Sequence, residues 1–98
     1  MLGAIVRIGP DGHQATLGCW VVRSSRGRGI GTRALRAVAE WTFETTDVVR
    51  VDAYIMVGNE VSERMTQRAG FQREGVKRNA LIVDGAAVNE ICMARIFC

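Results

Sequence analysis

A basic, glycine-rich turn separates two runs of regular pattern in this chain. The segment RGRGIG at 26–31 follows an apolar run at 17–22 and precedes a helical pattern at 30–43. Its three glycines let the backbone bend and turn successive N–H groups toward one point, and the helix that follows adds its positive N-terminal end. The sequence therefore predicts a strand, a phosphate-binding turn and a helix in that order.

Arginine dominates the same segment. Five arginines and no acidic residue fall between positions 23 and 36, namely Arg23, Arg26, Arg28, Arg33 and Arg36. Such a cluster favours a ligand with more than one phosphate. The net charge of +3 comes largely from this cluster. We interpret it as a local ligand site, and we do not expect a nucleic-acid surface, because aromatic residues do not interleave with the arginines.

Composition narrows the remaining possibilities. The 98 residues suffice for one domain, 1–98, with 48% hydrophobic and 23% charged residues. No apolar stretch approaches the length of a membrane span, and no signal-peptide pattern opens the chain. The residues Cys19, Cys92, Cys98 and His13 have no spacing that suits zinc or a redox motif. We expect a cytoplasmic protein without a metal site, in which the cysteines are buried apolar fillers.

The pattern along the chain alternates between strands and helices. The only proline and its glycine neighbours, at 9–12, predict a turn, and Asp84-Gly85 predicts another. We expect strands at 2–8, 15–22, 49–57, 71–83 and 88–97, and helices at 30–43 and 59–69, the second capped by Asn59 and followed by Gly70. This is an α+β fold with a mixed, mostly antiparallel sheet of about five strands. The pair joined by the first helix is parallel, through a right-handed crossover.

Two faces can be predicted from the apolar spacing. In the first helix the apolar positions are Ile30, Ala34, Ala37, Val38 and Trp41, so we expect Trp41, together with Phe43, to pack on the core or at its flank. In the strand that follows, Val51, Ala53, Ile55 and Val57 share one face.

The glycine-rich turn can also be compared with two other nucleotide-binding motifs, the Walker A loop and the dinucleotide-binding pattern. A Walker A loop needs a lysine, and Lys77, far from the turn, is the only one in the chain. The dinucleotide pattern GxGxx[GA] does match at 29–34, with Asp52 about 20 residues further on. However, Asp52 falls in the middle of its strand, and a hairpin follows where a further βαβ unit would be needed. We therefore set both interpretations aside.

The residues resemble the GCN5-related N-acetyltransferase (GNAT) family. RGRGIG is similar to its acetyl-CoA pyrophosphate loop, [QR]xxGx[GA], and Asn59-x-x-Ser62 with the following RAGF at 68–71 resembles a second block, NxxSxxxxxxAGF. The Glu74-Gly75 pair and Arg78 are similar to the branch that acetylates the N-terminal alanine of ribosomal proteins. The resemblance extends over about residues 15 to 97.

This resemblance implies roles for individual residues. It implies acetyl-CoA as acetyl donor, no metal, and catalytic positions at Asn59 and Ser62. It also implies that CoA is bound by Trp20, Val21, Arg26, Gly27, Arg28, Gly29, Gly31, Thr32 and Asn59. Strand N–H groups near Trp20 and Val21 would stabilise the oxyanion, and pantetheine would enter a gap beside an irregularity at Gly18.

The chain also departs from the family pattern. Family members begin with a strand, two helices and a second strand, whereas this sequence starts at the hairpin that follows them. Thr16 replaces a glutamate that acts as general base in the N-terminal-acetylating branch, and Thr66 replaces a tyrosine that protonates the leaving thiolate. Arg64 and Arg68 could reach the 3′-phosphate of CoA or simply face solvent.

Two functions follow from these expectations. The first is transfer of an acetyl group from acetyl-CoA to a primary amine, either a protein N-terminus or a small amine, by direct attack on the thioester. The alternative is a truncated, catalytically weak CoA-binding module within a homo- or hetero-oligomer. An uncovered edge strand at 2–8 is an aggregation liability. We therefore expect a homodimer, with that strand or the hairpin at 71–97 in the interface.

Overall fold

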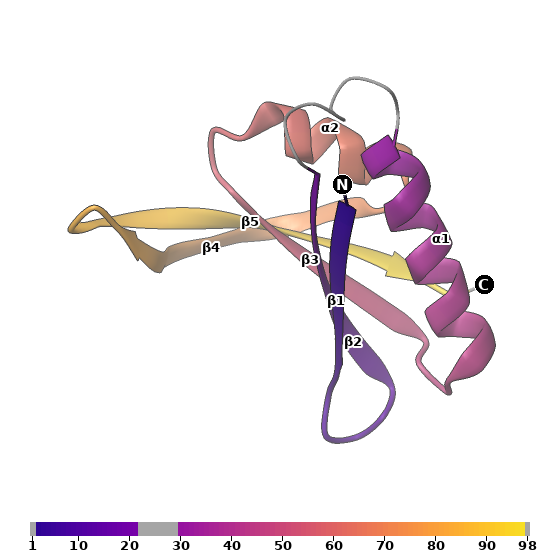
Figure 1. Cartoon of the computed structure of the whole chain (residues 1–98). Coiled ribbons are helices and arrows are strands. Elements are labelled where there is room, and N and C mark those ends of the chain that lie inside the picture. Colours follow the sequence, from indigo (N-terminus) through magenta and orange to yellow (C-terminus); the bar gives the residue numbers. More distant parts are fainter. Residues whose placement is uncertain (1, 22–29, 98) are drawn as a thin grey trace.

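The computed structural model describes residues 2–21 and 30–97. The elements in this part of the chain are β1 (Leu2–Ile8), β2 (Gln14–Val21), α1 (Ile30–Thr45), β3 (Arg50–Met56), α2 (Glu60–Arg68), β4 (Gln72–Val83) and β5 (Ala86–Ile96). The strands form one sheet in the order β1-β2-β3-β5-β4, and both helices lie over the same face of it (Figure 1). The predicted α+β fold with a mixed, mostly antiparallel sheet is confirmed.

The strand pairing follows the predicted connections. β1 and β2 form an antiparallel hairpin, β2 and β3 are parallel with α1 between them, and β4 and β5 form the long final hairpin. Asp84 (φ 50°) and Gly85 (φ 80°) both adopt positive φ, which is the geometry of a two-residue hairpin turn that continues the twist of its strands. β5 begins at Ala86, two residues earlier than expected. β1 forms one edge of the sheet, as predicted, whereas the homodimer stays a prediction.

The buried face of α1 differs from the predicted one by about one residue. The helix buries Gly31, Leu35, Ala39 and Thr42, whereas Trp41 is 57% exposed. The prediction of a packed Trp41 is therefore wrong. Thr42 can replace it inside because its hydroxyl donates to the Val38 carbonyl (2.8 Å), which satisfies the polar group. The apolar spacing thus predicted the wrong helix face, because the face that packs on the sheet combines Leu35 with two small residues and a threonine.

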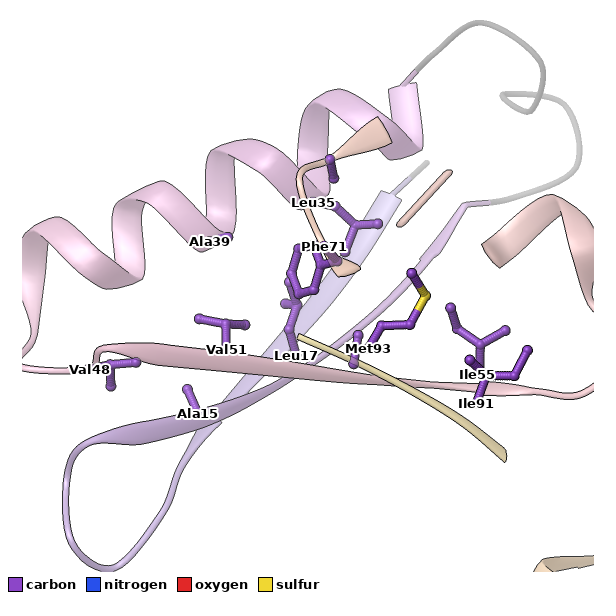
Figure 2. Close-up of a cluster of buried hydrophobic side chains, with 12 residues drawn as sticks. Ala15, Leu17, Leu35, Ala39, Val48, Val51, Ile55, Phe71, Ile91 and Met93 are labelled. Carbon is purple, nitrogen blue, oxygen red and sulfur yellow. The ribbon is translucent and has the colours of Figure 1, made fainter. Parts of the chain in front are cut away.

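The core lies between the helices and the sheet. Val51, Ala53 and Ile55 of β3 are buried, as predicted. Figure 2 shows Val51 and Ile55 on the α1 side of the sheet with Phe71 and Met93. Val57 is exposed instead, because β3 ends at Met56 and the chain turns at Gly58. Phe43 packs against this core as expected, and its ring centroid lies 5.5 Å from that of Phe97.

The second helix has both predicted caps. Asn59 is the N-cap residue, and its side-chain oxygen accepts from the Ser62 N–H (3.2 Å). At the other end Gly70 adopts φ +98°, so that the Gly70 and Phe71 N–H groups return to the Gln67 and Thr66 carbonyls (3.0 and 3.2 Å). These two bonds define a Schellman motif, which satisfies the last carbonyls of the helix.

Two further observations concern expectations from composition. No helix in the described part of the chain is long and apolar enough to cross a membrane. Cys92 is only half-buried, so that the prediction of a buried filler does not hold for this cysteine. The Cys98 part of that prediction lies outside the described residues, and for Cys19 only the backbone is described.

Candidate functional site

The two parallel strands stay together over a short distance. The register of β2 and β3 runs Gln14↔Arg50, Ala15↔Val51 and Thr16↔Asp52 and goes no further, although both strands continue. β2 remains paired to β1 along its whole length, and β3 remains paired to β5. The sheet therefore opens between β2 and β3 beyond Asp52.

The backbone of β3 turns polar groups toward this opening. The Val57 N–H donates to the Asn89 carbonyl of the neighbouring strand (3.0 Å). Because N–H and C=O direction alternates along a strand, the odd-numbered residues of β3 pair with β5 and the even-numbered ones face β2. Tyr54 and Met56 are even-numbered, and they lie beyond the last β2 pairing. Their backbone thus offers hydrogen-bonding groups to a ligand that enters between the strands.

A pocket of about 240 Å³ occupies this opening. It is bounded by the second half of β2, the end of β3 and one side of α2, with a single contribution from α1. Its lining residues are Leu17, Gly18, Leu35, Ala53, Tyr54, Ile55, Met56, Asn59, Ser62, Met65 and Thr66. The predicted gap beside Gly18 is present, but the predicted irregularity is not, because β2 keeps an unbroken register with β1 through Gly18. An extended chain with amide groups would fit the mixed apolar and polar walls of the pocket.

Asn59 and Ser62 meet at this pocket, as the sequence motif suggested. The side-chain Oδ1 of Asn59 accepts from the Ser62 N–H, so Asn59 is the N-cap of α2. The amide nitrogen of the same side chain is a separate donor group at the pocket wall. One side chain thus both starts the helix and lines the site.

Thr66 stands one turn further along α2. It is buried, and its hydroxyl donates to the Ser62 carbonyl (2.7 Å). That proton is already used, so Thr66 is a poor substitute for a tyrosine that releases a proton to a leaving group. Among the described residues that line the pocket there is neither a carboxylate nor an imidazole. A protein general base is thus lacking in this part of the site.

The remaining predicted residues are placed only in part. Gly31 is buried in the first turn of α1, beside a half-buried Thr32. The backbones of Trp20 and Val21 form the last two positions of β2, opposite β1. The predicted phosphate-binding residues Arg26, Gly27, Arg28 and Gly29 lie outside the described residues. Arg64 and Arg68 are exposed on α2.

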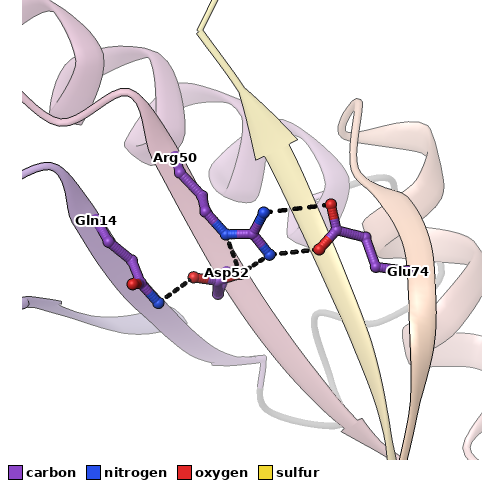
Figure 3. A network of polar contacts seen from close by, with 4 residues as sticks. All are labelled: Gln14, Arg50, Asp52 and Glu74. Carbon is purple, nitrogen blue, oxygen red and sulfur yellow. Dashed lines mark hydrogen bonds and ion pairs between the residues drawn. The ribbon is translucent and has the colours of Figure 1, made fainter.

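A polar cluster on the opposite face of the sheet was not predicted (Figure 3). Asp52 is only 4% exposed, and it accepts hydrogen bonds from Gln14 Nε2 (2.5 Å) and Arg50 Nε (2.9 Å). The Arg50 guanidinium also reaches across β5 to Glu74 on β4. The rejection of Asp52 as a ribose ligand is supported, because its carboxylate is engaged within the sheet.

Electrostatics at this cluster follow from the same contacts. The hydrogen bond with Arg50 holds the pKa of Glu74 below its ordinary value, and the hydrogen bonds to Glu74 and Asp52 raise the pKa of Arg50.

Tyr54 lies two residues beyond Asp52 on β3. Burial, followed by the nearby Asp52 charge, raises the pKa of Tyr54, so that its phenol stays protonated at neutral pH. Among the described residues no group of three or more His, Cys, Asp or Glu could hold a metal ion.

Sequence comparisons with known proteins point to one family. Residues 2–72 match the family described as acetyltransferase (GNAT) domain. YdaF of Bacillus subtilis (strain 168), provisionally named a ribosomal N-acetyltransferase, is 38% identical over 73 residues, which cover 74% of this chain and 40% of YdaF.

Solved structures extend the likeness to the whole fold. The ribosomal-protein-S5-alanine acetyltransferase of Vibrio fischeri superposes with a TM-score of 0.85 at 25% identity, covering 95% of this chain and 53% of that one. RimL, a ribosomal L7/L12 α-N-protein acetyltransferase in complex with coenzyme A, gives a TM-score of 0.85 at 28% identity, covering 92% of this chain and 51% of RimL. The chain spans about two fifths of the length of the curated relatives it matches.

Proposed function

Because this chain belongs to the GNAT acetyltransferase family, we propose that it transfers an acetyl group from acetyl-CoA to a primary amine. The observation that carries the proposal is the opening between β2 and β3, with its pocket of about 240 Å³. A protein N-terminus is the acceptor class that we favour, since ribosomal-protein N-acetyltransferases are among the similar proteins.

The described residues fit the pantetheine part of CoA. The backbone groups of Tyr54 and Met56 face the opening, where amides of an extended ligand could pair with them as a neighbouring strand would. Asn59 adds a side-chain donor at the same wall. We propose that the turn at 26–31 and the N-terminus of α1 hold the pyrophosphate, with Arg26 and Arg28 as charged contacts.

The acetyl thioester supplies an electrophilic carbonyl, which a neutral amine attacks. The C–S bond then breaks, the amide forms, and CoA leaves as a thiolate that takes up a proton to give the free thiol. Backbone N–H groups near Trp20 and Val21 are our candidates for stabilising the oxyanion, an effect that can lower a barrier by about 3–4 kcal/mol. Ser62 is our candidate for a polar contact at the reacting end, since it lines the pocket. Water is the proposed base, because the described pocket walls carry no carboxylate or imidazole.

Calorimetry with CoA tests the binding half of the proposal. Replacing Arg26 and Arg28 by alanine should weaken CoA binding by about tenfold or more, whereas Lys77→Ala, which removes an exposed charge on β4, should leave it unchanged. Gly29→Asp should abolish binding, because a negative side chain would enter the space of the pyrophosphate. Unchanged CoA affinity in both Gly29→Asp and the double arginine variant would refute the assignment.

Thiol release from acetyl-CoA tests the catalytic half. Peptides with a free N-terminal amine should support turnover, and the same peptides with a blocked N-terminus serve as the matched control. The commitment of the Thr66 hydroxyl to the Ser62 carbonyl favours a second candidate, a CoA-binding module with slow or no transfer. Stabilisation by CoA without turnover on any amine would select that candidate.

A further inference from the structure

The polar cluster of Figure 3 lies at the point where the sheet opens. Asp52 is the last residue of β3 that is paired with β2, and the pocket begins at the next residue, Ala53. Its carboxylate faces away from the helices, because Val51 and Ala53 on either side of it are buried in the helix-covered core. The cluster is therefore next to the pocket without lining it.

Each side chain of the cluster connects a different strand. Gln14 of β2 donates to one carboxylate oxygen of Asp52 (2.5 Å), and Arg50 of β3 contacts the other (2.7 Å). From there Arg50 reaches over β5 to Glu74. Glu74 sits where the β4–β5 register shifts between Arg73 and Gly75, a bulge that can re-aim a side chain. One chain of hydrogen bonds thus crosses the sheet from β2 to β4.

The Gln14–Asp52 contact is the part that joins the two diverging strands. Only three residue pairs join β2 to β3. A side-chain hydrogen bond between these two strands is therefore a large part of the contact that holds them together. Asp52 is buried, and a charge-assisted bond there is short and directional. Rotation of β2 about its three paired residues would stretch this bond, whereas the Arg50–Glu74 contact lies on the other side of β3.

We propose that Asp52, held by Gln14 and Arg50, is a positioning residue that fixes the angle at which β2 and β3 diverge and thereby the width of the pocket. Its effect on CoA rests on the proposed function. Its effect on the ligand-free pocket does not, because the Tyr54 backbone faces the opening between β2 and β3, and Tyr54 is the only tyrosine in the chain. A tyrosine labelled with 15N at its backbone amide therefore reports the opening through one resonance.

The test compares Gln14→Met with Glu74→Gln. Gln14→Met keeps the length of the side chain and the Arg50–Asp52 pair but removes the bond between β2 and β3. Glu74→Gln weakens only the ion pair between Arg50 and Glu74 on β4. Each variant is titrated with CoA and with adenosine 3′,5′-bisphosphate, a fragment of CoA that lacks pantetheine. Asp52→Asn replaces Gln14→Met if the latter fails to fold.

We expect Gln14→Met to weaken CoA by about five- to tenfold and to leave the bisphosphate unchanged. Its ligand-free Tyr54 resonance should shift, while Glu74→Gln should match the wild type in all three measurements. Equal weakening of both ligands, or an unmoved resonance in Gln14→Met, would overturn the proposal. If the wild type binds no CoA, the proposed function fails, and the Tyr54 resonance alone decides whether Gln14 positions the pocket.

Discussion

Two glycines with nearly the same φ offer a controlled test of packing at the end of α2. Gly70 has φ +98° and Gly58 has φ +99°, conformations that strain any residue with a Cβ. A Cβ built on Gly58 meets nothing within 4 Å. A Cβ on Gly70 would lie 3.3 Å from Nε of Arg95. Replacing each by alanine therefore places a Cβ at nearly the same positive φ, with and without a steric neighbour.

The expected magnitudes follow from these contacts. The backbone term is about 1–2 kcal/mol in both variants. In Gly70→Ala the Arg95 side chain must also shift by a few tenths of an ångström. This shift strains the bond from its Nη1 to the Ala69 carbonyl (3.1 Å), a bond that contributes about 0.5–1.5 kcal/mol. The Arg95–Glu40 ion pair adds little, since Glu40 is about half exposed. We expect Gly70→Ala to be about 1 kcal/mol less stable than Gly58→Ala.

Urea unfolding, followed by circular dichroism, measures both free energies of unfolding. The unfolded-state entropy that alanine removes is the same in the two variants and cancels in the comparison. A double-mutant cycle of Gly70→Ala with Arg95→Ala should recover the difference as a coupling free energy. Equal stability of the two glycine variants, or a coupling energy near zero, would show that Arg95 gives way at no cost and that the packing argument is wrong.

Three other predictions concern the pocket. Absorbance at the tyrosinate band should give Tyr54 a midpoint above the ordinary 10.0. The contribution of this pKa shift to the free energy of unfolding is therefore present below pH 10 and is lost as pH rises through the folded-state pKa. A titration midpoint of the folded protein at or below that of the urea-unfolded chain would contradict the claim that burial raises the pKa of Tyr54. The acetylation rate should rise with pH as the acceptor amine loses its proton, whereas a bell-shaped profile with an acidic limb near about pH 6 would indicate a protein base. Ser62→Ala should lower kcat by a larger factor than it weakens CoA binding, and equal factors would remove Ser62 from the reacting end.

Local signals made most of the fold predictable. Asn59 and Gly70 mark the two ends of α2 because each satisfies backbone groups that a helix leaves unpaired, and no distant residue is needed for either effect. Asp84-Gly85 likewise fixes the last hairpin through positive φ at both residues. The strand bounds differ from the predicted ones by at most two residues, although β4 contains two register shifts that its sequence pattern did not indicate.

Long-range contacts account for what the sequence did not reveal. Trp41 has the right spacing for a core residue, but α1 buries Leu35, Ala39 and Thr42 against the sheet instead. Arg50 and Asp52 share a strand face, a signal available from their spacing. Their partners Gln14 and Glu74 are 38 and 24 residues away, so that neither contact has a local pattern.

The candidate site shows the same division between local and distant causes. A phosphate-binding turn is a local object, made from glycines, arginines and a helix start, and a motif can therefore predict it. The opening that we propose for pantetheine is a missing pairing between β2 and β3, each of which stays paired to its other neighbour. Gly18 is the one local hint, because a glycine in a strand often accompanies an irregularity or a close approach of other atoms. The place where β2 leaves β3 depends on Gln14 reaching Asp52, and it could emerge only when the strands were assembled into the sheet.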